Sequence, residues 1–185
     1  ILNAWSKATG MAAIAMDDKG EYISGEIGST DFCMKYNKGS EEGAKRCLKC
    51  DQEGRDVYFC HAGLMDFGAP IMMNGKQIGS ILGGQVLTAP PDEDKFRAYA
   101  KEIGVDPEKY VAALREVQII SKDRLEYAAE VLFMMATAFS NMGYYKFQLK
   151  KLAASINETT MHVSAAMEQL AASANDVNEN QKGLN

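Results

Sequence analysis

The amino-acid sequence predicts an α+β fold: a mixed or antiparallel sheet flanked by helices, followed by one long C-terminal helix. Short apolar runs separated by turn residues predict strands in the first half of the chain, and capping residues predict helices after them. From Gln148 onward the chain contains no Pro, no Cys and no aromatic residue, so this stretch cannot build a core alone. We therefore expect a domain at residues 1–148 and an extended helix at residues 149–185.

Strands are expected where apolar runs meet turn residues. Met11–Met16 predicts a buried strand, and the turn sequence Asp17–Gly20 leads into a second strand at Glu21–Ser24. Asn74-Gly75 is typical of a two-residue hairpin turn between two further strands. This hairpin joins the run 69–73 to the partner run formed by 77–82 and 83–87, and a further strand is expected at 57–64.

Helices are predicted in the second half of the domain. The first covers Asp92–Ile103, where Gly104 is a suitable C-terminal cap. Asp106-Pro107 is typical of a helix start, with Asp as the cap and Pro in the first turn. Ser121 can cap a third helix, in which no stop signal precedes Gly183.

Composition and charge exclude several classes of protein. The 185 residues carry 20 Lys+Arg against 25 Asp+Glu, a formal net charge of −5, so we expect no nucleic-acid partner. The longest apolar stretch, residues 128–139, contains Glu130 and is shorter than the about 20 residues of a membrane span. No signal peptide is predicted. Because the chain begins with Ile, we expect it to be part of a longer protein.

The C-terminal stretch carries a heptad pattern. Residues spaced alternately by four and three form one seam, a pattern typical of a coiled coil. Its members are Leu152, Ile156, Thr159, Val163, Ala166, Leu170, Ser173 and Val177. Small residues at every second position predict a weakly stabilised interface, which suits an element that transmits signals. We expect a homodimer through this helix.

All four cysteines lie close together in the sequence, at Cys33, Cys47, Cys50 and Cys60. In Cys47-Leu-Lys-Cys50 the two sulfurs lie on the same side of a helical turn. Four thiolates can close a tetrahedral zinc site or hold an iron–sulfur cluster. We therefore predict a metal centre at these four residues and leave zinc and iron–sulfur undecided.

Two other interpretations of the cysteines stay open. Cys47 and Cys50 suit a thiol-redox switch or redox protein, whereas buried thiols without chemical function are common. The neighbouring cations Lys45, Arg46 and Lys49 are expected to lower the thiol pKa.

A pocket for a small organic ligand is also predicted, since polar residues among apolar strands are typical of such sites. The candidate ligand-binding residues are Tyr58, His61 and Gln85, with Trp5 as a further candidate among Met72, Ile81 and Val86. His61 follows Cys60 directly, and adjacent strand residues point to opposite faces, so no thiol–imidazole dyad is expected there. We expect no enzyme activity.

Several motifs of the domain occur in an order and spacing that resemble the PocR sensory domain. They are Thr9-Gly10, Asp31-Phe-Cys33, Cys47-Leu-Lys-Cys-Asp51, Cys60-His-Ala-Gly-Leu64, Pro70-Ile71, Gly79 and Gly84-Gln85. The resemblance runs from about residue 3 to about residue 148. It implies a PAS-like ligand-sensing module of the kind found on transcription regulators, histidine kinases and chemoreceptors. The founding example regulates propanediol use, so the resemblance implies small oxygenated organic ligands.

The C-terminal helix resembles a second family. Ile156-Asn-Glu-Thr-Thr160 and Met167-Glu-Gln-Leu-Ala-Ala-Ser173 are similar to the start of the signalling helix of methyl-accepting chemotaxis proteins. This resemblance implies a bacterial chemoreceptor that controls a chemotaxis histidine kinase and its adaptor through a downstream region. It also implies a cytoplasm-facing domain, in a receptor that is either soluble or membrane-anchored.

Overall fold

The computed structural model describes the backbone of residues 1–182 and the side chains of residues 1–175. The predictions at Val177 and Gly183 therefore lie outside the described side chains. Contacts within the chain divide it into two units, Ile1–Asn141 and Met142–Asn185, each of which is described by itself.

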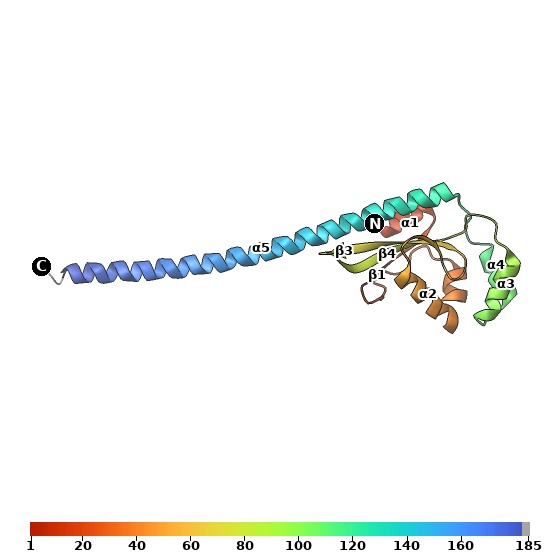
Figure 1. The fold of residues 1–185 in the computed structure, drawn as a ribbon, viewed down its shortest axis with the longest axis horizontal. Helices are drawn as coiled ribbons and strands as arrows, with labels where there is room; N and C mark the ends of the chain where they lie inside the picture. Colours follow the sequence, from red (N-terminus) through yellow and green to blue (C-terminus); the bar gives the residue numbers. More distant parts are fainter. Residues whose placement is uncertain (183–185) are drawn as a thin grey trace. The chain divides into compact units, whose positions relative to one another are not determined.

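The first unit is built on a four-stranded sheet. Its strands are β1 (Ala12–Asp17), β2 (Asp56–Phe59), β3 (Met65–Met73) and β4 (Lys76–Val86). They lie in the order β1-β4-β3-β2, and every neighbouring pair is antiparallel (Figure 1). The α+β prediction with an antiparallel sheet is therefore confirmed.

The hairpin between β3 and β4 forms at the predicted turn. Asn74 and Gly75 have φ values of 52° and 76°, the left-handed conformation that a two-residue turn requires. Strand β3 is longer than predicted, because it begins at Met65 and not at Ala69, whereas β4 covers nearly the whole run predicted at 77–87.

The strand predicted at Glu21–Ser24 is wrong. This segment makes a single isolated bridge to β1, which pairs Met16 with Tyr22. The Ser24 hydroxyl accepts a hydrogen bond from the Ala15 amide at 2.9 Å, so a side chain takes the place of a ladder partner. The alternation of apolar and polar residues cannot reveal that a side-chain hydroxyl replaces a backbone hydrogen-bond partner.

Helices occupy segments before, between and after the strands. They are α1 (Leu2–Thr9), the π-helical turn η1 (Phe32–Asn37), α2 (Glu41–Glu53), α3 (Glu93–Glu102), α4 (Pro107–Leu114) and α5 (Lys122–Lys182). The predicted caps are present: the Asp106 carboxylate accepts from the amides of Glu108 and Lys109, and the Ser121 hydroxyl accepts from the Arg124 amide.

Helices pack on both faces of the sheet, as Figure 1 shows with α1 and the first part of α5 on one face and α2 on the other. The first face buries a core of side chains from α1, the sheet and α5, which includes Trp5, Phe67, Ile81, Leu125 and Leu132. A second core lies around η1, α3 and α4 and includes Phe32, Tyr110 and Leu114. A functional site can therefore lie between the sheet and the elements η1 and α2.

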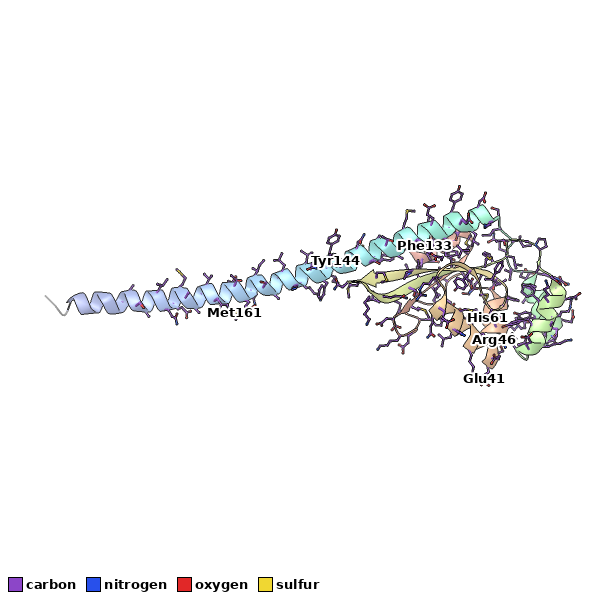
Figure 2. All side chains as sticks on the ribbon, in the orientation of Figure 1. Glu41, Arg46, His61, Phe133, Tyr144 and Met161 are labelled. Atoms are coloured by element: carbon purple, nitrogen blue, oxygen red, sulfur yellow. The ribbon has the colours of Figure 1, made fainter. Side chains whose placement is uncertain are left out.

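The second unit consists of helix in its described part. The larger residues of the predicted seam are exposed, with Leu152 at 57%, Ile156 at 59%, Val163 at 56% and Leu170 at 65%. Figure 2 shows the Met161 side chain projecting from the same stretch of helix. Among the residues that the structure describes, no helix combines the length and apolarity needed to cross a bilayer.

Candidate functional site

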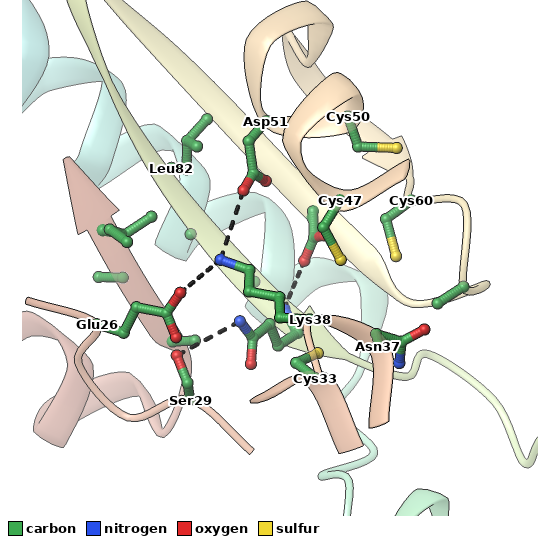
Figure 3. Close-up of a pocket in the computed structure, with 18 of the residues that line it drawn as sticks. Glu26, Ser29, Cys33, Asn37, Lys38, Cys47, Cys50, Asp51, Cys60 and Leu82 are labelled. Carbon is green, nitrogen blue, oxygen red and sulfur yellow. Dashed lines mark hydrogen bonds and ion pairs between the residues drawn. The ribbon is translucent and has the colours of Figure 1, made fainter. Parts of the chain in front are cut away.

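A pocket lies on the sheet between β1, β4, η1 and α2, with a volume of about 50 Å³. All three predicted ligand-binding residues, Tyr58, His61 and Gln85, line it, and so do all four cysteines. Figure 3 shows Cys33, Cys60 and the pair Cys47 and Cys50 of one helix around this pocket. Residues spread over more than fifty positions of the chain therefore meet at one site.

The four cysteines are free thiols. Their donor type suits a soft metal, and they share one pocket. Within the part of the chain that the structure describes, however, no three His, Cys, Asp or Glu side chains form a group that could hold a metal ion. Zinc, iron–sulfur and the redox use of Cys47 and Cys50 all stay predictions.

The expected lowering of the thiol pKa by nearby cations is wrong. Burial raises the pKa of Cys47 to about 12, and the carboxylate of Asp51 adds to this effect. Burial also raises the pKa of Cys33, Cys50 and Cys60. The cations are engaged elsewhere, since Lys45 pairs with Glu41 and Arg46 pairs with Glu42 and Glu102. The pocket therefore holds neutral thiols.

His61 makes a contact that the sequence did not indicate. Its Nε2 lies 3.1 Å from the Sγ of Cys47, and its Nδ1 lies 2.5 Å from the hydroxyl of Tyr99. Burial, together with the charge of Arg46, lowers the pKa of His61 to about 4, so the imidazole is neutral at pH 7. A dyad between His61 and Cys60 was not expected, and the thiol that His61 contacts is that of Cys47, a pair that the sequence analysis did not consider.

Gln85 owes its position to a β-bulge. Met65 pairs with Val86 and Asp66 pairs with Gly84, so Gln85 is the extra residue of β4. Its φ of 62° is left-handed, and its amide donates to the Asp66 carboxylate at 2.6 Å. Its side-chain oxygen accepts from the Thr30 amide at 3.1 Å, which fixes the loop over the pocket.

The Asp66 carboxylate is the most perturbed acid of the site. Burial raises its pKa to about 7, and the charge of Asp51 acts in the same direction. The hydrogen bonds from the Gln85 amide and the Cys60 thiol and the charge of Lys38 act against the rise. Near neutral pH this group exists in both protonation states and can either donate to a ligand or accept from it.

A charged network that the sequence analysis missed covers another side of the pocket. The Lys38 ammonium lies 2.5 Å from Glu26 and 3.7 Å from Asp51, as Figure 3 shows, and Tyr22 donates to Asp51 at 2.5 Å. The side chains of Lys38, Glu26 and Asp51 are each less than a fifth exposed. The only signal in the sequence was the position of Asp51 directly after the Cys-x-x-Cys pair.

The further candidate Trp5 does not line the pocket. It packs in the core with its ring centroid 5.9 Å from that of Phe67. Ile81 and Val86 belong to the same core, whereas Met72 is 39% exposed. The alternation of the strands places these residues away from the pocket.

An α+β domain with a polar pocket between its sheet and helices has the construction of a sensory domain. The chain belongs to the family described as "Sensory domain found in PocR", which it matches over residues 1–144. It is also 31% identical over 94 residues to the regulatory protein PocR of Salmonella typhimurium. That match covers 46% of this chain and 31% of the relative, so the chain corresponds to less than a third of the relative's length. No solved structure matches the chain.

Proposed function

We propose that this chain is the ligand-sensing part of a bacterial chemoreceptor. It binds a small oxygenated organic molecule in the pocket and passes the signal through a dimeric α5 helix to a chemotaxis histidine kinase. The observation that supports this proposal best is the pocket, where hydrogen-bonding side chains are buried in a sensory domain of the PocR family.

The polar groups of the pocket favour a ligand that donates hydrogen bonds. Glu26 Oε2 is buried and has no hydrogen-bond partner within the described part of the chain. Asp66 and Asp51 add two further acceptors, and the Lys38 ammonium lies 3.7 Å from Asp51. An unpartnered buried acceptor is costly, so a ligand hydroxyl that reaches Glu26 stabilises the bound state.

Strand β3 links the pocket to the helix that is proposed to carry the signal. Asp66, near the start of β3, faces the pocket. Near its other end, the Met72 amide donates to the Ser140 hydroxyl of α5 at 2.8 Å. A shift of β3 on ligand binding therefore acts on α5 through a direct contact, provided that the ligand binds the two arrangements with different affinity.

A second copy of the chain is the proposed partner of the C-terminal helix. Leu152, Ile156, Val163 and Leu170 are exposed in the single chain, although they follow the heptad spacing of a coiled coil. A lone helix has little stability in water. Burial of this seam against an identical helix supplies the apolar contacts that stabilise it. The kinase and its adaptor are proposed to act downstream of residue 185.

Glu26→Gln is expected to weaken binding of a small diol about tenfold, because a charge-assisted hydrogen bond is replaced by a neutral one. Isothermal titration of the 185-residue chain with ethane-1,2-diol, propane-1,2-diol and glycerol measures the effect. Glu21→Gln is the matched control, since Glu21 is an exposed acid of the same segment. If none of these compounds binds the wild-type chain, the proposed ligand class is wrong.

Insertion of four residues after Lys150 is expected to abolish ligand control of the kinase, because it rotates the seam relative to the sensory unit. Insertion of seven residues is expected to preserve control, since it keeps the heptad register. Kinase activity of the full-length receptor, measured with and without ligand, reads out both variants. Equal ligand control in the four-residue and seven-residue insertions would contradict transmission through the coiled coil.

A further inference from the structure

Cys47, His61 and Tyr99 form a relay that ends in the pocket. Cys47 Sγ lies 3.1 Å from His61 Nε2, and His61 Nδ1 lies 2.5 Å from the Tyr99 hydroxyl. Cys47 comes from α2, His61 from the turn after β2 and Tyr99 from α3, so three separate segments build this chain of contacts. Non-covalent binding of a ligand does not require this relay of three side chains.

The contact with Tyr99 suits one tautomer of His61. The Arg46 guanidinium lies over the Tyr99 ring, 5.6 Å from its centroid, and the Tyr99 oxygen lies beside His61 Nδ1. That oxygen has a lone pair that can accept from His61 Nδ1–H. Nε2 is then free to accept the proton of the Cys47 thiol, and the arrangement has the order nucleophile, base and orienting group.

The position of His61 determines which reaction the Cys47 thiol can undergo. Its Nε2 lies within hydrogen-bond distance of Cys47 Sγ, so the imidazole can take the thiol proton as the sulfur adds to a carbonyl carbon. The addition converts a neutral thiol and a neutral aldehyde into a neutral product, which suits a buried site.

We propose that the pocket binds a small aldehyde covalently and reversibly, through addition of Cys47 Sγ to the carbonyl carbon. This inference rests on the proposed ligand-sensing function and adds small aldehydes to the diols as a ligand class of the same pocket. The Sγ electron pair forms the S–C bond while the C=O π bond breaks. His61 Nε2 takes the thiol proton and delivers it to the former carbonyl oxygen, so a neutral hemithioacetal forms without an oxidant or a reductant. Loss of the same proton from the hydroxyl reverses the step.

Cys47 is the cysteine whose thiol contacts the His61 imidazole, and the other three have different surroundings. Cys50 Sγ accepts a hydrogen bond from the His61 backbone amide at 3.4 Å, and the Cys60 thiol donates to Asp66. Cys33 is buried, with 9% of its surface exposed. Cys50 is therefore the matched control, because it lies one turn from Cys47 on α2 and lines the same pocket.

Acetaldehyde labelled with ¹³C at its carbonyl carbon tests the proposal. The 185-residue chain is expected to show one hemithioacetal resonance in ¹³C NMR that disappears when the aldehyde is removed. Cys47→Ser is expected to abolish this resonance, whereas Cys50→Ser keeps it. His61→Gln is expected to slow adduct formation at least tenfold, and Tyr99→Phe to slow it less, because Tyr99 only positions the imidazole. Circular dichroism checks that each variant folds.

Three results would overturn the inference: the same resonance in Cys47→Ser, equal affinity of the wild type for acetaldehyde and ethanol, or stoichiometric zinc or iron in the purified protein with no adduct. The two proposals have separate readouts. Binding of a diol by Cys47→Ser would support the sensing function, and the NMR result with the wild type decides the covalent step. Failure of diols and aldehyde alike to bind the wild type would instead count against the sensing function itself.

Discussion

Asp66→Asn is expected to raise the free energy of unfolding at pH 8 by on the order of 3 kcal/mol and to leave it nearly unchanged at pH 4. The pKa of Asp66 rises from an ordinary value of 3.8 to about 7 in the folded protein, mainly because the carboxyl group is buried. A raised carboxyl pKa means that the folded state holds its proton more tightly than the unfolded state. The associated stability is complete below about pH 4 and is lost as the pH rises to 7.

Urea unfolding of wild type and Asp66→Asn between pH 4 and pH 8 measures this effect. Asp56→Asn is the control, because Asp56 is exposed at the start of β2. His61 contributes the opposite trend, since its pKa is lowered to about 4 and its share of stability is lost as the pH falls from 6.5. Both proteins contain His61, so its contribution cancels when the unfolding free energy of the wild type is subtracted from that of the variant at each pH. A constant difference between Asp66→Asn and wild type would contradict a buried, titrating Asp66.

Gly84→Ala is expected to destabilise the first unit by about 3 kcal/mol or more, through steric conflict at the bulge. A Cβ at Gly84 would lie 2.6 Å from the Asp66 Cα and 2.6 Å from the Met65 carbonyl oxygen, both of which are backbone atoms. The φ of 134° at Gly84 is also unfavourable for any residue with a side chain. The strand pair β3–β4 would have to separate at the bulge that positions Gln85.

Gly75→Ala separates the two causes. Gly75 also has a left-handed φ, of 76°, but a Cβ there meets no atom within 4 Å. We expect it to cost about 1 kcal/mol, the conformational penalty alone. Urea unfolding of both variants gives the comparison. Equal losses of stability would show that close backbone approach at Gly84 is unimportant.

Local features of the fold were predictable because their causes are local. Asn74-Gly75 forms its turn through backbone freedom at two adjacent positions, and Asp106 caps α4 through amides two and three residues away. The long helix followed from a stretch without stop signals. The strand predicted at Glu21–Ser24 does not form. There the Ser24 hydroxyl, and not a backbone carbonyl, accepts the hydrogen bond of the Ala15 amide.

The residues of the site were partly predictable. Sequence proximity brought the four cysteines into one prediction, and Tyr58, His61 and Gln85 also line the pocket. The sign of the thiol pKa change was predicted wrongly, because the adjacent cations Lys45 and Arg46 form ion pairs with glutamates of the same helix. Burial determines the thiol pKa instead, together with the carboxylate of Asp51, one turn further along α2.

The sequence by itself determined the class of fold, the hairpin, the helix caps and the family to which the chain belongs. Only the tertiary structure decided which side chains share the pocket: Lys38 with Glu26 and Asp51, Asp66 with Gln85, and Cys47 with His61 and Tyr99. Periodicity assigns a residue to a face of its own element, whereas contact between elements depends on strand order, on the bulge in β4 and on how α2 and α3 pack. Burial, and with it every pKa change in the site, exists only after that packing is complete.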